Sequence, residues 1–328
     1  TTSSSSHPSS PSSSSSSSLP TLATRLAEKD KEMLHERFEQ FTQRNKVNFW
    51  VLDATKAQAR MDGASPLSVE EKVMNFALTC NFYYPSQSLI LDLTDNNWND
   101  VFTRDELEEV NKEGGSLVCH EPEELNREFA GLRRVKTSVG AYQYARAIEI
   151  NDPVMEYLKV WMSRELQNIA HLFFKSHSFN IAGMPETDQQ YIAFGFFNSI
   201  FVGSDIVARG TENSSEANAN AINSSRQLSS VTAINKRKMG RRCDTIYKYG
   251  ARELGYCEVG AAKDQSKAFH DCSLKMPLVL RDMLLQLTYT PSLLHKSHVI
   301  GYSITCIYNF YIEFVDKSAS LYMKHLLT

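Results

Sequence analysis

Residues 241–259 read Arg-Arg-Cys-Asp-Thr-Ile-Tyr-Lys-Tyr-Gly-Ala-Arg-Glu-Leu-Gly-Tyr-Cys-Glu-Val, and this stretch decides the predicted fold. Apolar and polar residues alternate on both sides of a turn at Gly250, which is typical of a β-hairpin. If the turn centres on Gly250 or Ala251, Asp244 and Glu258 lie on one face of the hairpin, within reach of each other. A two-residue turn would break this parity and separate the two acids.

Two neighbouring carboxylates suggest a chemistry for this hairpin. They repel each other unless a proton or a cation lies between them, and Mg²⁺ binds to one or two carboxylates together with substrate phosphates. We therefore expect Asp244 and Glu258 to bind Mg²⁺ for hydrolysis of a nucleic-acid phosphodiester, beside the basic Lys263. The Lys and Arg side chains expected to hold the phosphate backbone precede the first acid: Lys236, Arg237, Lys238, Arg241 and Arg242.

Other interpretations of the same hairpin stay open. The acids and their basic neighbours also fit a solvated face with salt bridges, each worth less than about 1 kcal/mol. The basic run also matches a nuclear-localisation patch. A protein with this hairpin that binds nucleic acid or acts as a scaffold, without catalysis, is the alternative to a nuclease.

The net charge of −3 hides a division along the chain. Residues 1–230 contain 21 Lys and Arg against 30 Asp and Glu, whereas residues 231–328 contain 14 against 8. The net charges of these two parts are thus −9 and +6. The basic end contains the paired acids, so the overall charge does not exclude a nucleic-acid partner.

The cysteines and the apolar runs bear on location. The six cysteines form no Cys-x-x-Cys pair, which favours reduced thiols in an intracellular protein. Hairpin parity predicts that Cys243 and Cys257 share the face opposite the acids. No apolar run reaches the length of a membrane span, and no membrane partner is expected. The chain begins without Met and ends soon after a predicted strand, which suggests a piece of a longer protein.

Composition and periodicity predict three parts. The Ser-rich residues 1–20 form a disordered tail, residues 21–140 are mainly helical, and residues 141–328 form an α/β domain with a flexible loop at 203–235. Further expected elements are helices near 22–44, 68–80, 103–113, 153–175, 186–202 and 264–287, and strands near 88–93, 299–315 and 321–327.

Several common sites are missing from the sequence. It has no Gly-rich phosphate loop, no Gly-x-Gly-x-x-Gly, no Gly-x-Ser-x-Gly and no His-Glu-x-x-His, which argues against NTPase, dinucleotide, serine-hydrolase and zinc-protease functions. Residues 95–106 have oxygen-bearing side chains at most ligand positions of a calcium loop. Asp100, however, replaces the Gly of the sharp turn. A polar loop followed by a helix capped by Thr103 and Glu106 is the simpler interpretation.

The order helix, long loop, hairpin with Asp and then Glu, helix and strand resembles the core of the PD-(D/E)XK, or restriction-endonuclease-like, fold. That resemblance implies that Asp244 and Glu258 bind a metal and that Glu186, on the upstream helix, is a third ligand. The family pattern has a Lys two residues after the second acid, where this chain has Gly260. Lys263, at the start of the next helix, would take its place.

From about Asn151 onward the chain also resembles a large group of uncharacterised proteins of mucoralean fungi. The shared features include a Trp-bearing helix and the segments Gly-Arg-Arg-Cys-Asp244, Glu258-Val-Gly and Leu274-Lys-Met-Pro277. This resemblance implies a common architecture over more than half of the chain and names no reaction.

Overall fold

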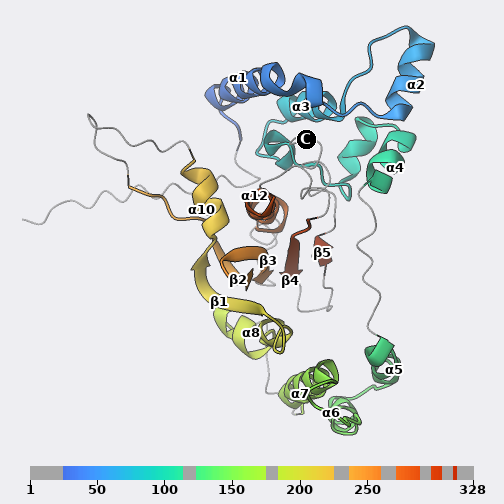
Figure 1. Cartoon of the computed structure of the whole chain (residues 1–328), viewed down its shortest axis with the longest axis vertical. Coiled ribbons are helices and arrows are strands. Elements are labelled where there is room, and N and C mark those ends of the chain that lie inside the picture. Colours follow the sequence, from blue (N-terminus) through green and yellow to red (C-terminus); the bar gives the residue numbers. More distant parts are fainter. Residues whose placement is uncertain are drawn as a thin grey trace, which may run out of the picture.

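The structure is a computed structural model that describes residues 25–113, 123–174, 184–224, 236–259, 271–288, 297–304 and 313–315. It has a mixed α/β architecture in which helices lie on both sides of a mixed sheet, as the sequence predicts (Figure 1). Within the described ranges, every helix is too short or too polar to cross a bilayer. The α-helices are α1 (Glu28–Asn45), α2 (Asp53–Asp62), α3 (Val69–Thr79), α4 (Arg104–Glu113), α5 (Glu123–Leu132), α6 (Ser138–Arg146), α7 (Tyr157–Leu172), α8 (Glu186–Ile192), α9 (Phe196–Ser199), α10 (Glu216–Ile222) and α12 (Met276–Leu287).

The described strands form one sheet in the order β1-β2-β3-β4-β5. The pairs β1–β2, β2–β3 and β4–β5 are antiparallel, and β3–β4 is parallel. Parallel neighbours need a crossover connection, and α12 lies between β3 and β4 in the chain. The bounds are β1 (Ile206–Ser214), β2 (Arg242–Tyr249), β3 (Arg252–Val259), β4 (Ile300–Ile304) and β5 (Glu313–Val315).

The hairpin and the elements after it agree with the sequence. Strands β2 and β3 are the predicted pair, and β4 and β5, which pair with each other, both lie in the segment 299–315 for which strand is predicted. Helix α12 starts with Pro in its first turn, where Pro is tolerated because the N–H it lacks has no helical partner. The predicted strand at 321–327 and the Ser-rich tail lie outside the described residues.

Each face of the sheet has its own apolar core. On one face, Phe194 and Phe197 pack against Tyr247 and Cys257. On the other, the core contains Met276, Val279 and Met283 of α12, with Ile246 and Tyr256 of the hairpin. Figure 1 shows α12 between the sheet and helices α1 and α3. The α12 face of the sheet is thus the one directed toward the N-terminal helices.

The N-terminal helices follow their local signals. Ser68 caps α3 and forms a reciprocal pair with Glu71, and Thr103 and Glu106 do the same at α4. The apparent calcium loop folds instead as a 3₁₀ turn, η3 (Asn96–Asp100), that leads into α4. The predicted strand near 88–93 is wrong: η2 (Pro85–Ser88) ends there in irregular chain that buries Ile90 and Leu91. A short apolar run alone does not distinguish a strand from a buried loop.

Two predicted helices differ from the structure in length. Asp152 caps a turn at residues 153–156, so α7 itself starts only at Tyr157. The single helix expected over 186–202 is wrong, because the chain turns between α8 and α9. This break lets both Phe194 and Phe197 contact the sheet.

The flexible loop predicted at 203–235 is wrong over residues 206–222, which form β1 and α10, while residues 225–235 lie outside the described set. Strand β1 lacks an alternating apolar pattern and is a strand because it pairs with β2 along the sheet edge. Ser215 caps α10, and Glu253 of β3, only 2% exposed, accepts bonds from the Ser215 hydroxyl and the N–H groups of Glu216 and Ala217. Burial and contacts distant in sequence thus order this segment.

Replacing Glu253 by alanine is expected to lower the free energy of unfolding by about 2–4 kcal/mol, because it leaves buried donors at the start of α10 without an acceptor. The measurement is urea unfolding followed by circular dichroism. Glu216→Ala is the matched control: Glu216 lies on the same helix in a half-exposed ion pair with Arg237, and less than 1 kcal/mol of change is expected. Equal losses in both variants would contradict this role of Glu253.

Candidate functional site

The hairpin brings its two acids together through an irregularity. Its turn has only two residues, Gly250 and Ala251, because Tyr249 pairs with Arg252. The register then shifts, leaving Leu254 as an extra residue, and Thr245 pairs with Cys257. This bulge restores the parity that a two-residue turn alone would break. The next positions along the two strands are Asp244 and Glu258, as predicted.

Asp244 lies at the end of the β2–β3 ladder. Its Oδ2 accepts a hydrogen bond of 2.7 Å from the backbone N–H of Val259. Its negative charge also acts on Glu258 and raises the pKa of that group. The pairing of β1 with β2 is irregular beside this point, between Gly210 and Asn213.

The expectation that the two hairpin cysteines share a face is wrong. Cys243 packs with Tyr256 in the core under α12, whereas Cys257 packs in the core under α9. The register shift of β1 beside Cys243 accompanies this departure from simple alternation.

Glu258 is a buried acid with one satisfied and one unsatisfied oxygen. Its residue is 4% exposed, and its Oε1 accepts a hydrogen bond from the ammonium of Lys275. Its Oε2 has no hydrogen-bond partner among the described residues. Burial raises the pKa of Glu258 to about 8; the charge of Lys275 opposes this rise, and that of Asp244 adds to it.

A second Lys–Glu pair in the same chain shows what a fully satisfied pair looks like. Glu106, also buried, accepts bonds of 2.6 and 2.7 Å from Lys72, one of 2.5 Å from Thr55 and one of 2.9 Å from the N–H of Thr103. Burial acts to raise the pKa of Glu106, but these bonds outweigh it and the pKa is lowered. Glu258 has similar burial with only one of its two oxygens bonded, and a buried acid with a raised pKa is a candidate functional group.

Lys275 is the site residue that the sequence prediction missed. It is the last residue of the short π-helix Asp271–Lys275, directly before α12. The negative charge of the buried Asp271 acts on both Lys275 and Glu258. Burial acts to lower the pKa of Lys275, but the charge of Glu258, the hydrogen bond to Glu258 and the charge of Asp271 together outweigh it, and the pKa is raised. The only sequence signal was the segment Leu274-Lys-Met-Pro277, in which Lys precedes a helix start.

The side chains of two predicted site residues, Lys263 and Glu186, lie outside the described residues, so the structure does not place them beside Asp244 and Glu258. Glu186 is the first residue of α8. The residues after α8 pack on the sheet face opposite α12.

The basic segment does not act as one surface. Lys236, Lys238 and Arg242 are exposed. Arg237 is also exposed, and it binds Glu216 at 2.6 Å and Asn220 at 2.9 Å on α10. Arg241 turns inward, and its Nε is buried without a hydrogen-bond partner in the described part of the chain.

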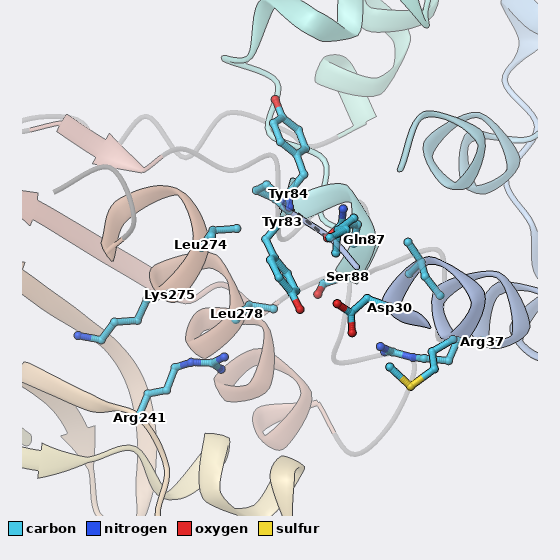
Figure 2. A pocket seen from close by; sticks show the side chains of 14 residues that line it. Asp30, Arg37, Tyr83, Tyr84, Gln87, Ser88, Arg241, Leu274, Lys275 and Leu278 are labelled. Carbon is cyan, nitrogen blue, oxygen red and sulfur yellow. Dashed lines mark hydrogen bonds between the residues drawn. The ribbon is translucent and has the colours of Figure 1, made fainter. Parts of the chain in front are cut away.

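A cavity of about 240 Å³ adjoins the site. Figure 2 shows its wall, formed by residues of α1 and η2 on one side and by Arg241 and the start of α12 on the other. Lys275 belongs to both, since it lines the cavity and binds Glu258.

The acid pair offers oxygen donors, the kind that a hard cation prefers. In the part of the chain that the structure describes, no three His, Cys, Asp or Glu side chains are grouped to hold a metal ion. Mg²⁺ needs only one or two carboxylates when substrate phosphates and water complete its octahedron. The unsatisfied Oε2 of Glu258, beside Asp244, fits such a role. Comparison of the chain with protein-family models, curated proteins and solved structures finds no match.

Proposed function

We propose that this protein is a Mg²⁺-dependent nuclease with a PD-(D/E)XK-like core, in which Asp244 and Glu258 hold the ion. One observation carries the proposal: Glu258 is buried beside a second acid with an unsatisfied oxygen, in contrast to the fully bonded Glu106. The order α8, β2–β3 hairpin, α12 and β4 supports the core, although β1 and α10 occupy part of the segment where the resemblance implies a long loop.

Each residue has a separate part in this proposal. When bound, Mg²⁺ supplies Lewis acidity to the attacked phosphate and its leaving oxygen. Glu258 and Asp244 would hold the ion through carboxylate oxygens. Lys275 fixes Oε1 of Glu258, and the ion would bind the buried Oε2, which has no hydrogen-bond partner among the described residues. The family Lys two residues after the second acid is Gly260 in this chain. Lys275, rather than Lys263, supplies the missing lysine beside Glu258. The exposed Lys236, Lys238 and Arg242 hold the phosphate backbone, with Arg237 on the edge of the same segment.

The proposal predicts cleavage of single- or double-stranded DNA or RNA that needs Mg²⁺ or Mn²⁺ and stops when EDTA is added. Asp244→Asn, which keeps the size of the side chain and its capacity to accept from Val259, is expected to lower the rate at least about 100-fold. Gel assays on labelled strands and plasmid measure this. Asp188→Asn, at an exposed position of α8, is the matched control and should cleave like the wild type. No cleavage by the wild type with either ion, or equal cleavage by Asp244→Asn, would refute the nuclease.

A second candidate function is a nuclease-like protein that binds nucleic acid without cutting it. The observation in its favour is that Lys275 already gives the buried Glu258 a positively charged partner, the part that the metal ion has in the nuclease. Binding that weakens with salt, persists in EDTA and survives Asp244→Asn would support this candidate. Loss of binding on replacing Lys236, Lys238 and Arg242 together would locate it to the basic segment.

A further inference from the structure

The cavity next to Lys275 has an apolar body with charged groups at its edges. Its lining includes Leu26, Leu34, Leu274 and Leu278, so most of a bound molecule would meet apolar wall. Tyr83 presents its ring between the α1 side and the α12 side, as Figure 2 shows. Such a wall suits a flat, weakly polar group. A nucleic-acid base is one such group, because every base has a flat face that can stack on an aromatic ring.

The guanidinium of Arg241 lies at one end of the cavity. In Figure 2, the guanidinium of Arg241 points toward α12 and the cavity, and its Nε has no acceptor among the described residues. Burial lowers the pKa of Arg241, and the negative charge of Asp282 acts against this shift without cancelling it. A phosphate is the usual partner of a guanidinium in this condition, because it accepts two parallel hydrogen bonds.

The opposite end has acceptors for N–H groups. Asp30 lines the cavity from α1 and uses its Oδ2 to accept from the N–H of Ala27. Figure 2 shows the Asp30 carboxylate on the same side as the Tyr83 hydroxyl and Ser88. The lining thus has Arg241 at one end and Asp30, with Arg37 beside it, at the other, with the aromatic wall between them. These parts correspond to those of a nucleotide: phosphate, base face and base edge.

We propose that this cavity binds a nucleoside 5′-monophosphate unit, with its phosphate on Arg241, its base against Tyr83 and the base edge toward Asp30. The unit is either a free nucleotide or the terminal nucleotide of a strand. The second case rests on the proposed nuclease, because Lys275 would then connect the bound end of the strand to the acid pair.

The test uses the full chain and titration calorimetry with AMP, GMP, CMP and UMP, with adenosine and inorganic phosphate as partial ligands. At least one monophosphate should bind at least tenfold tighter than either partial ligand. Arg241→Met should weaken its binding about tenfold or more, and Tyr83→Leu about fivefold or more. Arg241→Lys should recover part of the affinity, because it keeps the charge and loses the paired donors.

Matched control variants outside the cavity distinguish loss of this binding from a general effect of removing an exposed Arg or Tyr. Arg44→Met lies on α1 outside the cavity, and Tyr191→Leu replaces a tyrosine that is 82% exposed; both should bind like the wild type. Inorganic phosphate binding as tightly as every monophosphate, or unchanged affinity in a folded Arg241→Met, would overturn the assignment. Folding of each variant is checked by its urea midpoint.

A short single strand with a 5′-phosphate distinguishes the two sources. If it competes with the bound monophosphate and loses affinity in Arg241→Met, the cavity takes a strand end; if the monophosphate binds alone, the cavity takes a free nucleotide. Monophosphate binding in a protein that cleaves nothing would refute the nuclease and leave this assignment standing. Cleavage that is lost in Asp244→Asn, in a protein that binds no monophosphate, would support the nuclease and refute the assignment of this cavity.

Discussion

Replacing Lys275 by methionine is expected to lower the free energy of unfolding by about 3–5 kcal/mol at pH 9, because it leaves Glu258 as a buried acid without its cation. At pH 5 the loss should be much smaller, since Glu258 then binds a proton. In the wild type, the pKa of Glu258 is raised from 4.5 to about 8, so the folded state holds this proton longer than the unfolded state. The contribution of Glu258 therefore falls as pH rises from about 4.5 to 8.

Urea unfolding of the metal-free protein at pH 5 and pH 9 measures both effects. The double variant Lys275→Met and Glu258→Gln should recover most of the loss, because neither charge then remains buried. Glu258→Gln alone should flatten the fall in stability between these pH values. Lys56→Met, in an exposed pair with Asp53, is the matched control and should cause no measurable change. Wild-type stability of Lys275→Met at pH 9 would mean that the buried pair does not form.

Replacing Gly255 by alanine is expected to destabilise the protein by about 3 kcal/mol or more. Gly255 pairs with Ile300 where β3 meets β4, and a methyl group there would overlap the backbone carbonyl of Ile300. Backbone atoms in the ladder cannot move aside as a flexible side chain would. The strand positions that follow Gly255 lead to Glu258, so the same change should also disturb the acid pair.

The matched control is Gly210→Ala in β1 of the same sheet. Its new methyl group would lie 3.6 Å from the Asn198 side chain, which is an ordinary contact, and a change within about 1 kcal/mol is expected. Thermal unfolding followed by circular dichroism compares the two. Similar stability of both variants would show that the close approach of β3 to β4 is absent in solution.

The elements that were predictable are those whose signals are local. The alternation around Gly250, the reciprocal caps at Ser68 and Thr103, and Pro277 in the first turn of α12 each act within a few residues. Alternation also predicted that the two acids would lie on one face of the hairpin. It did not predict the bulge at Leu254, which allows this arrangement although the turn has only two residues.

The rest depends on contacts between distant parts of the chain. Strand β1 has no strand pattern of its own and is held by β2, and α10 is held by Glu253 of β3. Lys275 is 17 residues from Glu258 and ordinary in its local sequence, so only packing of the short π-helix against the hairpin identifies it. The cavity is likewise a product of packing, because α1 and η2 close it against residues more than 150 positions later.

Local periodicity and capping were therefore enough to specify the hairpin, several helices and the two acids, because these need only hydrogen bonds and burial patterns between near neighbours. Burial of Glu258, its pairing with Lys275 and the inward turn of Arg241 were decided by the tertiary structure. The energy of a buried charge depends on which distant side chains surround it, and no short stretch of sequence contains that information.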